Sequence, residues 1–64
     1  MKIGFIGLGN VGGKLARSLL RNKFDLTVRD LDKNLTKPFF DLGAKTANSP
    51  KELAEKVDLI ITCL

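Results

Sequence analysis

The stretch Gly7-Leu8-Gly9-Asn10-Val11-Gly12 follows directly on the apolar run Ile3-Gly4-Phe5-Ile6 and precedes a segment with helical periodicity. In such a turn the first glycine permits torsion angles that a Cβ would strain, and the second allows a ligand to approach the backbone closely. The third glycine lets the helix lie close to the sheet, and the start of the helix offers unpaired N–H groups to an anion. The pattern G-x-G-x-x-G between strand and helix therefore predicts a site for the diphosphate of a dinucleotide.

The length of 64 residues corresponds to one small unit, whose stability should be marginal. The single Cys63 cannot form a disulfide within the chain, and without histidine no zinc-type cluster is expected. The longest apolar run is far shorter than the roughly 20 residues that span a membrane. The start Met1-Lys2-Ile3 turns straight into a strand and leaves no room for a signal peptide. We therefore expect a cytoplasmic protein that binds neither metal nor membrane.

The formal net charge of +4 raises the question of a nucleic-acid partner. The basic residues, however, are dispersed along the chain, and no aromatic residue is interleaved among them to stack on bases. A solvated surface explains this distribution better than a nucleic-acid interface does. A modest positive field would also favour an anionic cofactor.

Four segments carry the apolar or alternating pattern of strands. They are Lys2–Ile6, Phe24–Arg29, the short Ala44–Thr46 and Leu59–Leu64.

Three helices are expected between these strands. The first follows the glycine stretch and ends at Asn22-Lys23. Its apolar face should comprise Val11, Leu15, Ala16, Leu19 and Leu20. The second should run from about Lys37 to Leu42 after a loop through Lys33-Asn34, because Pro38 fits only the first turn of a helix.

The third helix has the clearest start signal. Ser49 is the expected N-cap, Pro50 takes the first position, and Glu52 is the capping-box partner. Glu52 and Lys56 should form an i,i+4 ion pair. The apolar face should comprise Leu53, Ala54 and Val57.

The alternation of strands and helices predicts an α/β fold. Right-handed crossovers give a Rossmann-type parallel sheet in the strand order 3-2-1-4, which is partial because the chain stops at its fourth strand. The free edge of that strand should be long and apolar, so the isolated chain should be poorly soluble or oligomeric.

Asp30 lies at the end of the second strand, near the roughly 20-residue offset from the glycine stretch at which such folds place an acid. A carboxylate there can accept hydrogen bonds from the adenosine ribose hydroxyls and repels a 2′-phosphate. The alternative is an aspartate that only opens a turn. Arg29 could receive a 2′-phosphate, but its place within the strand should direct it away from Asp30. NAD is therefore preferred over NADP.

Thr62, Cys63 and Leu64 lie at the carboxyl end of a central strand, where open α/β sheets bind ligands. We expect backbone and packing contacts with the cofactor, or plain core packing for Cys63. Asn10 can bind a phosphate or stabilise the turn. None of these residues is a general acid or base for hydride transfer, so no catalytic residue is assigned in this chain.

The extended motif from Ile3 to Gly12, followed by Leu15-Ala16 and Leu19, resembles the N-terminal signature of the β-hydroxyacid dehydrogenases. Members that use NAD place an acid where this chain has Asp30, whereas members that prefer NADP show Asn-Arg in place of Asp30-Leu31. Further matches are Gly43-Ala44, Asn48-Ser49-Pro50 and Asp58 to Leu64. The chain departs from the family at Val11, where methionine is usual, at Gly13-Lys14 and at Pro38.

The resemblance implies that residues 1–64 are the N-terminal part of a dinucleotide-binding domain in an NAD(P)-dependent dehydrogenase. Such an enzyme interconverts a β-hydroxyacid and its aldehyde or keto form, and the full-length protein should be a homo-oligomer. The implied cofactor contacts are Gly7, Leu8, Gly9, Asn10, Val11, Gly12, Asp30, Leu31, Cys63 and Leu64. The family's catalytic lysine and helical substrate domain have no counterpart here. The alternative is a non-catalytic module that binds a nucleotide or a partner with the same fold.

Overall fold

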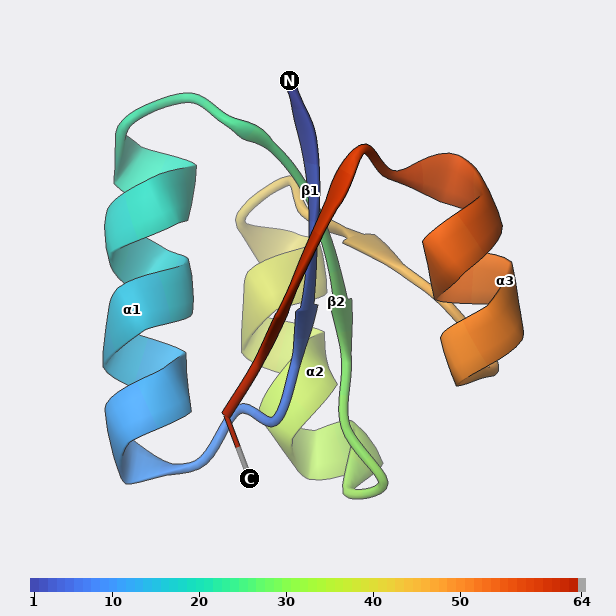
Figure 1. The fold of residues 1–64 in the computed structure, drawn as a ribbon. Coiled ribbons are helices and arrows are strands. Elements are labelled where there is room, and N and C mark those ends of the chain that lie inside the picture. Colours follow the sequence, from blue (N-terminus) through green and yellow to red (C-terminus); the bar gives the residue numbers. More distant parts are fainter. Residues whose placement is uncertain (64) are drawn as a thin grey trace.

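A four-stranded parallel sheet runs through the computed structural model, which describes residues 1–63 (Figure 1). Its strands are β1 (Lys2–Ile6), β2 (Asp25–Arg29), β3 (Lys45–Thr46) and β4 (Leu59–Thr62). The spatial order is β3-β2-β1-β4, and every neighbouring pair is parallel. The predicted α/β class and the strand order 3-2-1-4 are therefore confirmed.

Three helices connect the strands, namely α1 (Asn10–Arg21), α2 (Lys33–Asp41) and α3 (Pro50–Lys56). α1 and α2 pack on one face of the sheet, while α3 covers the other (Figure 1). This two-sided covering explains why β1 reads as a nearly continuous apolar run and why the three middle residues of both β1 and β2 are buried.

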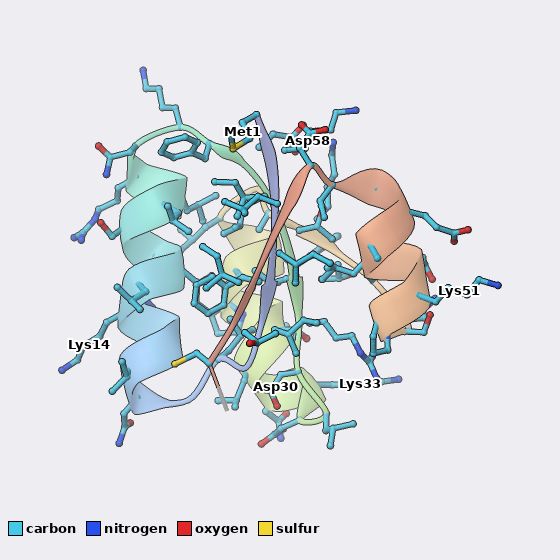
Figure 2. The ribbon with its side chains drawn as sticks, in the orientation of Figure 1. Met1, Lys14, Asp30, Lys33, Lys51 and Asp58 are labelled. Carbon is cyan, nitrogen blue, oxygen red and sulfur yellow. The ribbon has the colours of Figure 1, made fainter. Side chains whose placement is uncertain are left out.

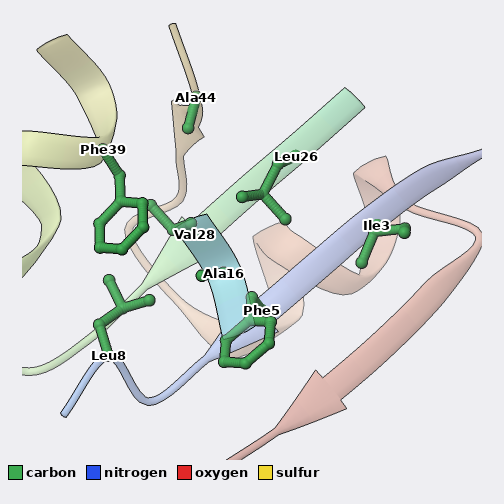
Figure 3. Close-up of a cluster of buried hydrophobic side chains, with 8 residues drawn as sticks. All are labelled: Ile3, Phe5, Leu8, Ala16, Leu26, Val28, Phe39 and Ala44. Atoms are coloured by element: carbon green, nitrogen blue, oxygen red, sulfur yellow. The ribbon is translucent and has the colours of Figure 1, made fainter. Parts of the chain in front are cut away.

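The main core lies between the sheet and the helices α1 and α2 (Figure 3). Alternate residues of the two central strands point into it, and the register pairs Ile3 with Leu26 and Phe5 with Val28. The remaining members come from the loops and helices around the sheet. They are Leu8, Ala16, Phe39 and Ala44.

The opposite face of the sheet is covered by α3. Thr27 is buried there, and a Cβ at Gly4 would overlap the side chain of Leu53 on α3. The missing side chain of Gly4 therefore lets α3 lie directly on β1.

The predicted apolar face of α1 is only partly correct. Ala16 is fully buried and Leu19 and Leu20 pack against the core, but Val11 is 66% exposed and Leu15 is 51% exposed. The reason is that the small residues Gly12 and Ala16, one turn apart, take the centre of the buried stripe. Val11 and Leu15 each precede one of them by one position, which turns them by about 100° toward the rim.

The predicted start of the second helix was wrong. α2 begins at Lys33, because the Asp32 side chain caps it by accepting from the amide of Asn34 at 2.9 Å. Pro38 lies inside the helix rather than in its first turn. The carbonyl that Pro38 leaves without a helical partner belongs to Asn34, which is exposed, so solvent can reach it.

The predicted N-cap of α3 is confirmed, because the hydroxyl of Ser49 accepts from the amide of Glu52 at 3.0 Å. The Glu52 carboxylate accepts from the amide of Asn48 at 3.3 Å, one residue before the Ser49 amide that the predicted capping box would use. The Lys56–Glu52 ion pair forms at 3.0 Å. Ala54, which was expected on the apolar face, is exposed.

Element ends differ slightly from the expected ones elsewhere. β2 begins at Asp25 rather than Phe24, and β3 at Lys45 rather than Ala44. β4 ends at Thr62, and its expected end at Leu64 lies outside the described residues.

Candidate functional site

Three segments that are far apart in the sequence meet at the carboxyl edge of the sheet. The register pairs Ile6 with both Arg29 and Thr62, so the residues that follow, Gly7, Asp30 and Cys63, leave the sheet side by side. The amide of Gly7 donates to the Arg29 carbonyl at 3.0 Å, and the amide of Cys63 donates to the Ile6 carbonyl at 2.8 Å. The glycine turn is therefore anchored to both neighbouring strands.

The backbone of the turn requires glycine at two positions. Gly7 has a φ of +97°, and a Cβ there would overlap the carbonyl oxygen of Cys63. A Cβ at Gly12 would overlap the carbonyl oxygen of Gly7. The predicted mechanical roles of these glycines, a tight turn and close helix packing, are confirmed.

The amino end of α1 has no side-chain cap. Its N-cap is Gly9, and its first turn contains no acidic residue. The caps of α2 and α3, by contrast, are side-chain oxygens of Asp32 and Ser49. Nothing lies within 4 Å of the point where a Cβ of Gly9 would sit. The first amides of α1 and the positive end of its dipole thus face open space that an anion can enter.

The Asp30 carboxylate lies beside this turn. One oxygen accepts from the amide of Leu8 at 2.7 Å, and the other accepts from the amide of Asp32 at 2.9 Å. These two hydrogen bonds hold the pKa of Asp30 below its ordinary value, because they stabilise the charged form. Figure 2 shows Asp30 and Lys33 at this end of the sheet, and Met1 and Asp58 at the opposite end.

Arg29 is held by the loop between β3 and α3, since its guanidinium donates to the Asn48 carbonyl at 2.9 Å. This bond directs the group toward the loop, yet Arg29 still lines the same cleft as Asp30, and its charge contributes to the lowered pKa of that residue. The expectation that Arg29 points away from the Asp30 site is therefore met only in part.

A cleft of about 240 Å³ opens between the carboxyl ends of β1 and β2. Its lining is Ile6, Gly7, Arg29, Asp30, Leu31 and Pro50. Leu31 is 92% exposed. Ile6 and Pro50 were not among the predicted contacts. The strand order 3-2-1-4 could have revealed Pro50, because the turn after β3 must leave the sheet at the same edge.

A groove of about 370 Å³ flanks the glycine turn on its other side, between α1 and α2. Gly9, Asn10, Lys14 and Arg17 line it from the turn and from α1. The turn therefore has open space on both sides.

The other predicted site residues are placed as follows. Asn10 and Val11 are exposed on the first turn of α1, while Cys63 is partly buried and packs against the core cluster. The packing role weighed for Cys63 is thus present in the structure. Leu64 lies outside the described residues.

Two classes of site receive no support from residues 1–63. No group of His, Cys, Asp or Glu among them could hold a metal ion. None of the helices described for these residues is long and apolar enough to cross a membrane.

Comparison with known proteins connects this geometry to a family. Residues 2–64 match the profile described as the NAD binding domain of 6-phosphogluconate dehydrogenase. The mitochondrial 3-hydroxyisobutyrate dehydrogenase of Mus musculus is 44% identical over 62 residues, which are 97% of this chain and 18% of that protein. An uncharacterized oxidoreductase of Bacillus subtilis, YfjR, is 41% identical over the whole chain and 22% of its own length. The chain thus spans about a fifth of the relatives that it matches.

Solved structures agree with these relatives. An imine reductase variant from Myxococcus stipitatus in complex with NAD+ has a TM-score of 0.94 at 25% identity, over 98% of this chain and 22% of that one. The imine reductase of the same organism in complex with NADP+ has a TM-score of 0.93 at 26% identity, over 97% and 22%. Since the profile extends from β1 to the end of the chain, this chain belongs to the β-hydroxyacid dehydrogenase family and forms part of its NAD-binding domain.

Proposed function

We propose that this chain binds NAD at the carboxyl edge of its sheet and forms the cofactor-binding part of a longer dehydrogenase. The observation that carries the proposal is the uncapped amino end of α1, which lies next to the Asp30 carboxylate at the same sheet edge. Gly9 leaves open space beside the turn, so the residues present fit a group that must approach the backbone closely.

The diphosphate, the adenosine ribose and the purine ring of the cofactor each have a matching group in this chain. The diphosphate fits the amides of Asn10 and Val11 at the start of α1, where the helix dipole favours negative charge. The ribose hydroxyls can donate to Asp30. Leu31 and Pro50 give the cleft beside Gly7 apolar walls against which a purine ring can pack. When bound, the nicotinamide ring supplies the hydride acceptor or donor.

The charge beside the ribose site favours NAD over NADP. The Asp30 carboxylate is held in its charged form by its two backbone hydrogen bonds, and a charged carboxylate repels a 2′-phosphate. Arg29 moderates this repulsion through its positive charge, while its hydrogen bond to the Asn48 carbonyl holds the guanidinium toward the loop between β3 and α3. Complexes with NAD+ and with NADP+ both occur among the similar structures, so NADP is the second candidate.

The activity of the whole protein is proposed from its relatives. Their names point to the oxidation of a β-hydroxyacid such as 3-hydroxyisobutyrate, or to the reverse reduction. The resemblance to the family adds the proposal of a homo-oligomer in which a helical domain supplies the catalytic residues. A cytoplasmic location stays a prediction, since the mouse and human relatives are named as mitochondrial enzymes.

Titration of the chain with NAD tests the proposal. Backbone amide shifts in an NMR spectrum should concentrate at residues 8–12 and at Asp30, and Asp58 at the opposite end of the sheet should not respond. Shifts spread over the surface, or no shift at millimolar NAD, would contradict the site. Turnover of 3-hydroxyisobutyrate by a longer protein that contains this chain would then separate a dehydrogenase from a module that binds NAD without catalysis.

A further inference from the structure

Asp30 connects two parts of the candidate site. Its carboxylate accepts from the amide of Leu8, which lies 22 residues earlier in the glycine turn, at 2.7 Å. The second oxygen accepts from the amide of Asp32, which caps α2, at 2.9 Å. One side chain thus fixes the glycine turn against the start of the second helix.

The amide of Leu8 lies in the glycine turn, two residues before α1 begins, and its hydrogen-bond acceptor is the Asp30 carboxylate. The side chain of Leu8 is buried in the core, which holds its Cα in place. The peptide unit between Gly7 and Leu8 is contacted at both ends, since its carbonyl oxygen packs against Gly12 and its amide donates to Asp30. Among residues 1–63, Asp30 is the hydrogen-bond acceptor of that amide, so its carboxylate holds the donor end of the peptide unit.

We propose that Asp30 is a positioning residue for the diphosphate, separately from any contact that it makes with the ribose. By holding the Leu8 amide it fixes the path of the chain through Gly9 and so the direction of the first amides of α1. Donors that are held in place before binding need not be ordered when the ligand arrives, which raises affinity. The inference rests on the proposed function, because it concerns how the same site binds its ligand.

A ligand without ribose hydroxyls separates the two roles. ADP and 2′,3′-dideoxy-ADP carry the same diphosphate, but only ADP can donate from its ribose to Asp30. Their affinities for the full chain can be measured by calorimetry in the wild type and in Asp30→Ala. If Asp30 positions the turn, Asp30→Ala weakens binding of the dideoxy ligand by about fivefold or more. Loss of the negative charge alone would strengthen the binding of an anion, so electrostatics cannot produce this result.

Two further variants control for damage to the fold. Asp58 also accepts from a backbone amide, that of Lys2 at 2.9 Å, but at the opposite end of the sheet. Asp58→Ala should therefore leave the affinity for both nucleotides unchanged. Asp30→Asn keeps one acceptor oxygen and should give an intermediate loss. Hydrogen exchange gives a readout without ligand: the Leu8 amide should lose protection in Asp30→Ala, while the Cys63 amide, bonded to the Ile6 carbonyl, should retain it.

The outcomes are distinct. If the wild type binds both nucleotides and Asp30→Ala leaves the affinity for dideoxy-ADP or the exchange of Leu8 unchanged, the positioning role is overturned and the proposed function stands. If the wild type binds neither nucleotide, the proposed function fails, and the positioning role fails with it.

Discussion

The carbonyl oxygen of Cys63 fills the space where a side chain at Gly7 would begin. Gly7 and Cys63, which follow β1 and β4 and are 56 positions apart in the sequence, are therefore tightly packed against each other at the candidate site. Gly7 also has a φ of +97°, a conformation that residues with a Cβ rarely adopt. Position 7 is restricted both by its own torsion and by its neighbour.

Gly7→Ala should therefore destabilise the fold more than the torsion alone explains. Gly43 is a matched control, because its φ is +104° but nothing lies within 4 Å of its Cβ position. We expect Gly43→Ala to lower the free energy of unfolding by about 1 kcal/mol. Gly7→Ala should lower it by about 3 kcal/mol or more, since the backbone of β4 must also move. Urea unfolding curves measure both values, and equal losses would show that the contact with Cys63 is unimportant.

Gly9→Ala, unlike Gly7→Ala, should leave the stability of the fold nearly unchanged and should weaken NAD binding. The space around Gly9 is open and its φ is −67°, so a methyl group fits the protein itself. The change in the free energy of unfolding should stay within about 1 kcal/mol. Affinity for NAD should fall by about tenfold or more, because the methyl group blocks the approach of the diphosphate to the backbone. A normal NAD titration in this variant would place the diphosphate elsewhere.

The parts of this fold that could be predicted are those specified by residues close together in the sequence. The glycine turn and the Ser49 N-cap each depend on residues within one turn of the chain, and both were predicted correctly. The start of α2 was missed because the prediction rested on Pro38, whose usual place is the first turn of a helix, and did not consider Asp32 as an N-cap.

Two features of the structure depend on tertiary packing and could not be predicted from local sequence patterns, namely the buried side of α1 and the hydrogen-bond partner of Asp30. A 3.6-residue period marks Val11 and Leu15 as apolar-face residues, but the small Gly12 and Ala16 determine which side of α1 meets the sheet. The bond between Asp30 and Leu8 spans 22 positions, and no local pattern specifies it. Sequence reasoning thus placed Asp30 at the right edge of the sheet without revealing the amide that it holds.

Asp30→Ala should weaken NAD binding and reduce the preference for NAD over NADP. The substitution removes the acceptor for the ribose hydroxyls, and it also removes the charge that repels a 2′-phosphate. We expect about a tenfold loss of NAD affinity and a smaller loss, or a gain, for NADP. Fluorescence titration with NADH and NADPH measures both. Unchanged NADH affinity would remove Asp30 from the cofactor site.

Stability should decrease in acid through Asp30 and Glu52. Backbone hydrogen bonds lower the pKa of Asp30 from 3.8, and the hydrogen bond from Lys56 together with the Asn48 amide lowers the pKa of Glu52 from 4.5. A carboxylate whose pKa is lower in the folded state stabilises the fold above its unfolded pKa, and this contribution is lost as the pH falls through the folded pKa. The free energy of unfolding should therefore be flat above about pH 6 and fall below about pH 4.5.

Substitution of each carboxylate by its amide tests which residue causes the loss of stability in acid. Asp30→Asn and Glu52→Gln should each flatten the slope below pH 4.5, the unfolded pKa of Glu52, when chemical unfolding is followed at a series of pH values. Asp41→Asn is the control variant, because it removes a carboxylate for which the structure shows no side-chain hydrogen bond within residues 1–63. An unaltered slope in both test variants would mean that other carboxylates produce the acid dependence.

The isolated chain should associate with itself through β4. This strand pairs with β1 on one side, and within residues 1–63 no strand pairs with its other side. Leu59 is 45% exposed and Ile60 is 43% exposed, so the free edge carries apolar side chains beside unpaired backbone groups. Sedimentation velocity at rising concentration should show oligomers. A cooperative unfolding transition of a monomer in dilute solution would contradict this prediction.

A charge on β4 should reverse the association if the edge is responsible for it. Ile60→Lys places a charge on the edge strand, which opposes strand pairing between molecules. Phe40, which is 61% exposed on α2, supplies the control, because Phe40→Lys removes exposed apolar surface far from β4 in the sheet order. We expect Ile60→Lys to shift the chain toward monomer and Phe40→Lys to leave the oligomers in place. Equal effects of the two substitutions would indicate general hydrophobic association rather than pairing through the strand.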